Sequence, residues 1–317
     1  MKERIKPLGW LLALLPLAAG PARAQTDTEM VQLRDKAGQL EEFRVLTSDK
    51  TTRHGPYVRY RMTERTAGIT VYEAGTYDHG QKQGEWRSFA ENRSRNRLVS
   101  RGTYRAGIAE GPWVYYHFNA VPAPPRTVLT GQPQASGSFS FATDDTTAVV
   151  QARGFCVAGA RAGLWKYYDA KSSLVQAINH STTPAQLLYW QPATGPAVSG
   201  AAALANHPVL YVGGKEQLQR DILNAFAPKF LAEYGRAASI GVAFQVDGNG
   251  QQTSVELTTK AQPTRYEQLV LTQLGKIATR WLPRVADGRA QAASYYVLLT
   301  STAEGNTRLL TAEPLGN

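Results

Sequence analysis

Residues 75–89 read GTYDHGQKQGEWRSF, and this pattern of glycine and aromatic residues returns twice farther along the chain. The second copy, at 102–116, reads GTYRAGIAEGPWVYY, and the third, at 154–168, reads GFCVAGARAGLWKYY. Residues 55–60, GPYVRY, match half of the pattern ahead of the first copy. Such recurrence predicts a stack of similar units, because one copy alone cannot bury its apolar face.

Each copy has the pattern of a β-hairpin. Gly80 and Gly84 bracket a short connection where positive φ or a close backbone approach is expected. The aromatic residues alternate, which places them on one face of the hairpin. We therefore expect an all-β stack of hairpins over residues 50–191, after a lead-in at 25–49. The tryptophans of the copies are expected to be core residues that hold adjacent hairpins together; they are Trp86, Trp113 and Trp165.

Over about residues 50–170 this spacing resembles MORN-type repeats, in the variant where a Gly-x-Trp-x-x-Tyr hairpin recurs. The resemblance implies a surface that binds proteins or lipids. It does not by itself identify a ligand, because function depends on the site rather than on the fold.

A cluster of arginines lies within and after the first copy. Two interpretations are open: a patch that binds anionic lipid headgroups or anionic glycans, or a solvated hairpin edge whose charges discourage edge-to-edge pairing. The residues are Arg87, Arg93, Arg95, Arg97, Arg101 and Arg105.

The composition is that of a folded, globular protein. The chain has 317 residues, 43% hydrophobic and 19% charged, which is enough for two domains. The formal net charge of +10 favours anionic partners without choosing among them. The five histidines show no metal-ligand spacing, and no nucleophile or phosphate-loop motif is present, so we predict neither a metal, a cofactor nor catalytic residues.

The N-terminus has the pattern of an export signal. Basic residues at 2–6 precede an apolar stretch at 8–19, and Ala22-Arg23-Ala24 fits a cleavage site. We predict a signal peptide at 1–24 and a mature protein in the periplasm or on the envelope. Nucleic acid is therefore not an expected partner. Cys156 is the only cysteine, which excludes an intramolecular disulfide and leaves none near the cleavage site for a lipid anchor.

Residues 192–206 are rich in Ala, Gly and Pro and carry no charge, which predicts a linker between two domains. After it the pattern becomes mixed α and β. Apolar periodicity predicts helices at 215–226 and 265–279, with a short helical turn at 230–234. Alternation predicts strands at 240–246, 253–257 and 294–300, the first two joined by a turn at Asp247-Gly248. This second domain is expected at 207–301, followed by a tail at 302–317.

Three features of this part resemble the C-terminal domain of TonB-type energy transducers: Gly213-Gly214, the strand and turn ending at Asp247-Gly248, and Trp281-x-Pro283. The resemblance implies an α/β sandwich with two helices on a three-stranded antiparallel sheet. It also implies that an envelope or outer-membrane protein adds a strand to the sheet edge. The edge residues would be Ser294, Tyr295, Tyr296, Val297, Leu298, Leu299 and Thr300, and the same edge could join two copies as a homodimer.

The fold class expected is thus α+β in two domains, and the first functional hypothesis is an exported interaction or scaffold protein. A TonB-type transducer whose N-terminal segment is retained as an anchor is one alternative. An envelope enzyme is another, because residues distant in sequence can still converge in a pocket. Asp247-Gly-Asn249-Gly is interpreted as a turn and not as a calcium loop, since the later ligands of an EF-hand are missing.

Overall fold

The computed structural model describes residues 27–36, 38–63, 68–92, 95–117, 148–192, 194–226, 238–259, 262–277, 280–304 and 307–314. Most of these residues are in β-strands. The predicted signal peptide, Arg93 and the helical turn at 230–234 lie outside the described residues. No helix in the described segments is long and apolar enough to cross a lipid bilayer.

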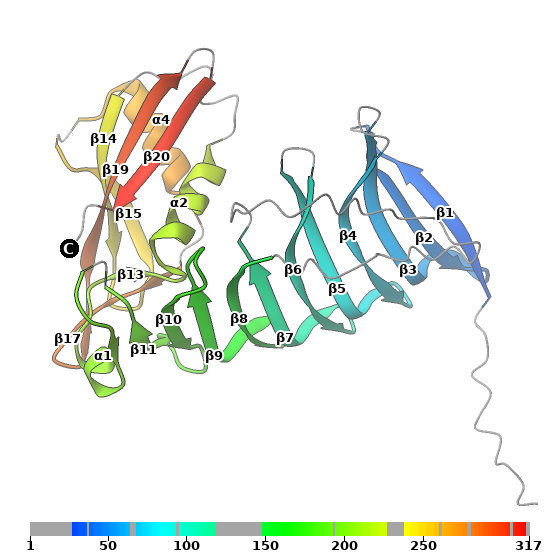
Figure 1. The fold of residues 1–317 in the computed structure, drawn as a ribbon, viewed down its shortest axis with the longest axis horizontal. Helices are drawn as coiled ribbons and strands as arrows, with labels where there is room; N and C mark the ends of the chain where they lie inside the picture. The colour runs from blue at the N-terminus through cyan, green and yellow to red at the C-terminus, as the bar shows by residue number, and fades with distance from the viewer. Residues whose placement is uncertain are drawn as a thin grey trace, which may run out of the picture.

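Twelve strands between Thr28 and Ser199 form one antiparallel sheet, in which each strand pairs with its neighbours in the sequence. We call it the repeat sheet. Figure 1 shows its strands following one another along the long axis of the molecule. They are β1 (Thr28–Arg34), β2 (Leu40–Leu46), β3 (Asp49–Thr63), β4 (Gly68–Asp78), β5 (Gln81–Asn92), β6 (Arg95–Arg105), β7 (Ile108–Tyr116), β8 (Val150–Val157), β9 (Ala160–Tyr168), β10 (Leu174–Asn179), β11 (Gln186–Trp190) and β12 (Val198–Ser199).

The all-β character predicted for this part is confirmed, but the sheet begins before residue 50. β1 and β2 occupy the stretch predicted as a lead-in, and they pair with each other from Thr28↔Leu46 to Arg34↔Leu40. Leu40, Phe43 and Val45 of β2 are buried, so this hairpin contributes to the core.

The hairpins turn where the glycines predict it. In the three copies the two central turn residues both have positive φ: His79-Gly80, Ala106-Gly107 and Ala158-Gly159. Two consecutive positive-φ residues define the type I′ turn, whose twist matches that of the flanking strands. Gly84 also has positive φ, as expected.

The first glycine of each copy has a role that the sequence did not reveal. A Cβ atom on Gly75 would lie 2.3 Å from the indole ring of Trp86. The corresponding distances are 2.1 Å for Gly102 to Trp113 and 2.4 Å for Gly154 to Trp165. Each tryptophan therefore packs directly on a glycine of the preceding strand, and the predicted core role of the three tryptophans is confirmed by their burial.

The described residues between 207 and 314 form what we call the C-terminal lobe. Its main sheet has four strands in the order β15-β14-β19-β20, and its two described helices pack apolar residues against β14 and β19. The lobe contains β13 (Leu210–Tyr211), α2 (Gly214–Ala225), β14 (Ala238–Val246), β15 (Gln252–Leu257), α4 (Arg265–Leu274), β16 (Trp281–Leu282), β17 (Arg284–Ala286), β18 (Arg289–Gln291), β19 (Ala293–Glu304) and β20 (Thr307–Pro314).

The predicted helices and strands of this lobe are present with shifted ends. α4 ends five residues before the predicted 279, at Leu274, where Gly275 follows and disfavours further helix. It begins at a capping box formed by Thr264 and Glu267, which satisfies free amides of the first turn.

The predicted three-stranded sheet is wrong in one respect: a fourth strand is present. β20 lies within the predicted tail and pairs antiparallel with β19 from Val297↔Pro314 to Glu304↔Thr307. Residues 307–314 read TRLLTAEP, which does not alternate clearly between apolar and polar residues, so this stretch was assigned to the tail. Val297–Thr300 therefore do not form an open sheet edge.

The C-terminal lobe and the repeat sheet share a hydrophobic cluster. Leu210, Val212 and Leu282 of the lobe pack with Trp113 and Trp165 of the repeat sheet. The two parts stand against each other at the β9–β11 end of the sheet (Figure 1).

A buried glutamine side chain reinforces this junction. Gln176 on β10 donates from Nε2 to the Tyr211 carbonyl at 3.0 Å and accepts from the Gly213 amide at 2.7 Å. The Gln176 side-chain amide is buried, and both its nitrogen and its oxygen are hydrogen-bonded. It therefore holds two residues near the start of the lobe, Tyr211 and Gly213, against the repeat sheet.

The stretch predicted as a linker contains β12 and the helix α1 (Ala201–Ala205). Ala203 is fully buried, and the Gly288 amide donates to the Ala205 carbonyl at 2.8 Å. Small alanine side chains favour helix and close packing as well as loose linkers, so the composition was ambiguous.

Candidate functional site

A cavity of about 640 Å³ lies at the junction between the repeat sheet and the C-terminal lobe. We call it the junction cavity. The repeat sheet lines it with Tyr104, Trp113, Tyr115 and Arg161 among others, and the lobe with Asn249, Gln251, Arg280 and Trp281 among others. The volume is in the range typical of small-ligand sites.

The cavity lies where small side chains replace two large ones in the repeat. Two positions after the turn glycine, the first and third copies hold Lys82 and Arg161, but the second copy holds Ala109. The third position of a copy is tyrosine in the first two, but Cys156 in the third. Ala109 and Cys156 both line the cavity.

Elsewhere along the sheet a cation fills the equivalent space. The Lys82 Nζ lies 4.0 Å from the ring centroid of Trp86, and the Arg161 guanidinium carbon lies 4.6 Å from that of Trp165. Arg53, at the same position of the leading half-copy, lies over Phe43 at 4.4 Å. Cations on ring faces are attracted by the ring quadrupole. Ala109 cannot make this contact.

A hydrogen-bond chain orders one wall of the cavity. Arg161 Nη1 donates to the Tyr167 hydroxyl at 3.0 Å, and that hydroxyl lies 2.9 Å from His180 Nε2. Burial, with the nearby Arg161 charge, lowers the pKa of His180 to about 4. Burial raises the pKa of Tyr167 to about 12. At neutral pH the hydroxyl therefore donates to a neutral imidazole, and Arg161 supplies the positive charge of this wall.

The electrostatics of the cavity favour an anion. Arg161 and Arg280 line it, whereas no aspartate or glutamate does so among the described residues. Arg280 is exposed, and so are the amide side chains of Asn249 and Gln251. Guanidinium and amide groups beside apolar walls can hold a carboxylate attached to an apolar group.

The one thiol at the cavity is poorly suited to nucleophilic chemistry. Burial is the main cause that raises the pKa of Cys156, and the thiolate is the reactive form. Cys156 is also 5% exposed. Burial thus leaves this thiol weakly reactive.

The structure does not gather the predicted arginine patch into one site. Arg97 is buried, Arg105 is exposed, and they lie eight residue steps apart along β6, about 26 Å. Arg87 bonds Glu85 at 2.6 Å and lies opposite Arg101. Arg95 begins β6.

Of the predicted strand-accepting residues, two are buried in the lobe and the others are half-buried or exposed. Val297 and Leu299 are core residues, and Tyr295 packs against Trp281 with ring centroids 5.2 Å apart. Ser294 donates to Gln245 Oε1 at 2.6 Å. Tyr296 is 41% exposed, and Leu298 and Thr300 are half-buried. With β20 on one side and β14 on the other, Val297–Thr300 have no free backbone edge.

The residues that carry the TonB-type resemblance have structural roles in the lobe. Gly213 and Gly214 have positive φ at the start of α2. The Asp247 side chain accepts from the amides of Asn249 and Gln251 at 2.9 and 2.8 Å, which closes the turn at Gly248 as predicted.

Trp281 and Pro283 are both buried. The Trp281 ring lies among Tyr211, Phe244 and Tyr295, and its Nε1 donates to Gln252 Oε1 at 3.1 Å.

Sequence reasoning missed the junction cavity. A comparison of the three copies position by position would have shown Ala109 and Cys156 among the small exceptions. Nothing in the sequence, however, indicated that Arg280 and the Asn249–Gln251 turn would face them.

Comparisons with protein-family models, with curated proteins and with solved structures find no match for this chain. The MORN-type and TonB-type likenesses are resemblances of motif.

Proposed function

We propose that this protein is an exported envelope adaptor that binds an extended, acidic segment of a protein partner. The observation that carries the proposal is the positively charged junction cavity, which both parts of the molecule line. A segment held there would contact the repeat sheet and the C-terminal lobe at once.

Strand addition is assigned to β15 rather than to β19. β15 is an edge strand of the four-stranded sheet, and its Thr253 and Glu256 side chains are exposed. The turn that leads into β15, Asn249–Gln251, lines the junction cavity. A peptide paired with β15 would thus bring one end to Arg280 and Arg161. Backbone pairing would supply affinity, and the arginines would select an acidic end.

The predicted export signal and the TonB-type resemblance support an envelope location and a protein partner. The transducer hypothesis needs a retained anchor, and N-terminal sequencing of the mature chain distinguishes the two: Gln25 at the start would contradict an anchor. The pKa of Cys156 and the hydrogen-bonded His180 favour binding over an envelope enzyme.

The test is site-specific photocrosslinking of the full-length protein in its own envelope. A photoreactive phenylalanine replaces Thr253 on β15, and the control position is Met30, which is 46% exposed on the edge strand β1. We expect one envelope protein to crosslink at position 253 and not at position 30, through an acidic peptide that mass spectrometry identifies.

Charge reversal then tests the cavity. Arg280→Glu should reduce the crosslink at least tenfold, because it places a like charge against the acidic end. Arg289→Glu is the matched control, since Arg289 is also an exposed lobe arginine but does not line the cavity. Equal crosslinking at positions 253 and 30, or equal effects of the two reversals, would contradict the proposal.

A further inference from the structure

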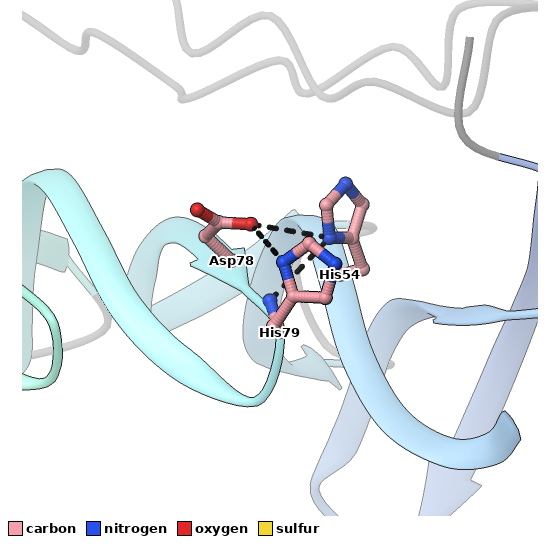
Figure 2. Close-up of side chains that lie close together, drawn as sticks. All are labelled: His54, Asp78 and His79. Carbon is pink, nitrogen blue, oxygen red and sulfur yellow. Dashed lines mark hydrogen bonds and ion pairs between the residues drawn. The ribbon is translucent and has the colours of Figure 1, made fainter. Parts of the chain in front are cut away.

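A second cluster of chemically active side chains lies far from the junction cavity. It consists of His54 on β3, Asp78 at the end of β4 and His79 in the turn that follows. Figure 2 shows the carboxylate and the two imidazoles pointing toward one another from neighbouring segments. We call these three residues the turn cluster.

The ligand atoms of the turn cluster are close enough for one ion. Asp78 Oδ1 lies 3.4 Å from His54 Nδ1 and 2.6 Å from His79 Nδ1, and all three atoms lie within 4.8 Å of one another. Ligand atoms about 2.0–2.2 Å from a tetrahedral zinc ion lie roughly 3.4 Å apart. Small side-chain rotations would therefore bring all three onto one ion.

The other copies of the repeat lack this set. The positions of His54, Asp78 and His79 correspond to Gln83, Arg105 and Ala106 at the next turn. At the third turn they correspond to Glu110, Val157 and Ala158. Neither set offers an imidazole. The turn itself does not require histidine, because alanine takes the same positive-φ position in both other copies.

The repeat also shows the competing structural role of His54. Gln83 and Glu110 accept hydrogen bonds from the backbone amides of Ala106 and Ala158 at 3.0 and 3.1 Å. His54 Nδ1 accepts from the His79 amide at 3.4 Å, which is the longest of the three. That long bond would be given up at low cost, because His79 is exposed and water can replace the acceptor.

We propose that His54, Asp78 and His79 bind a late first-row divalent cation such as Zn²⁺. Two imidazoles and one carboxylate form the donor set that such ions prefer, and a three-ligand set leaves a position for water. Asp78 and His79 are mostly exposed, so the ion would have direct access from solvent. The bound ion would link β3 to the β4–β5 turn and stabilise this end of the repeat sheet.

The test is titration of the untagged full-length protein with ZnCl₂ by isothermal calorimetry at pH 7.5. We expect one equivalent to bind at the turn cluster. His79→Ala restores the residue of the other two turns, and His54→Gln restores the amide acceptor of the next turn. Both variants should fold, and each should weaken zinc binding at least tenfold, since loss of an outer-shell partner alone costs about 10–100-fold.

Two controls separate the site from a general histidine effect. Ala106→His places one histidine in the equivalent second turn, beside Gln83 and Arg105, and should add no zinc equivalent. Thermal unfolding should show a zinc-dependent rise in Tm for the native protein that both cluster variants lack. Zinc affinity and Tm shift that are unchanged in His79→Ala and His54→Gln would overturn the proposal.

Discussion

The space between the first and second copies of the repeat is filled, whereas the space between the second and third is hollow. At the first, Lys82 lies over Trp86 and Tyr104 at 4.0 and 5.3 Å. At the second, Ala109 and Cys156 occupy the equivalent positions and line the junction cavity. The backbone is the same at both, since Gly107 and Gly159 donate to the carbonyls of Lys82 and Ala109 at 2.9 and 3.1 Å.

This difference shows that the residues that set the backbone of the repeat are distinct from the residues that can form a binding site. Glycines and tryptophans set the backbone and recur in every copy. The residue two positions after the turn glycine and the third residue of the copy can vary, because their side chains only fill space beside the tryptophans. A binding site can thus form in the repeat sheet without any change to its strands.

The largest loss of stability is expected for substitutions of the first glycine, which all three copies share. Gly102→Ala would place a Cβ atom 2.1 Å from the Trp113 ring and should destabilise the protein by about 3 kcal/mol. Gly154→Ala should behave alike, because its distance to Trp165 is 2.4 Å. Urea unfolding followed by tryptophan fluorescence measures both.

Gly84→Ala is the control for backbone strain alone. Gly84 has φ of 70°, and no atom lies within 4 Å of its added Cβ. Its cost should be about 1–2 kcal/mol, from the left-handed backbone only. Equal costs for Gly84→Ala and Gly102→Ala would mean that contact with the tryptophan is not what requires glycine.

The second prediction contrasts two equivalent tryptophans. Trp86 Nε1 donates to the Thr76 carbonyl at 3.1 Å, whereas Trp113 Nε1 is buried and has no hydrogen-bond partner among the described residues. Trp86→Phe should therefore cost about 1 kcal/mol more than Trp113→Phe, since only the first loses a hydrogen bond. The contact with Lys82 adds in the same direction. Unfolding midpoints of the two variants, compared in one buffer, decide the matter.

The sequence was sufficient for these hairpins because their signals are local. Positive-φ turns, alternating aromatics and a recurring tryptophan all act within one copy, and they predicted the strands from β4 to β9. The fourth lobe strand was missed because β20 pairs with a segment that sequence reasoning had already assigned to an edge. The packing of 192–206 was missed because alanine composition alone does not separate a linker from a buried helix.

The candidate site was harder to predict than the fold. Ala109 and Cys156 are visible as exceptions once the copies are aligned, but a small residue predicts space only if nothing else fills it. Whether Arg280 and the Asn249–Gln251 turn close over that space depends on how Gln176 and the shared cluster orient the lobe. That orientation is set by contacts between distant residues.

The third prediction concerns a variant that fills the space between the second and third copies. Ala109→Met should occupy part of the cavity, because methionine adapts to irregular gaps, and should raise stability by about 0.5–1 kcal/mol. The crosslink from position 253 should fall with it. Ala109→Ser, which leaves the space open, is the control. A crosslink that persists in Ala109→Met would place the partner outside the cavity.

The smallest effect at neutral pH is expected from His180, which affects stability only on acidification. Its pKa is about 4 in the folded protein, against an ordinary value of 6.5, because burial and Arg161 disfavour the charged imidazole. Below pH 6.5 the unfolded chain takes up a proton that the folded protein refuses, so this residue lowers stability progressively down to about pH 4. His180→Gln removes that proton uptake. The variant should therefore lose less stability than the native protein between pH 6.5 and pH 4, as urea midpoints at several pH values would show. If the stability of the native protein and of His180→Gln changed in parallel with pH, His180 would be protonated as readily in the folded protein as in the unfolded chain. That result would contradict its role as a neutral acceptor for Tyr167.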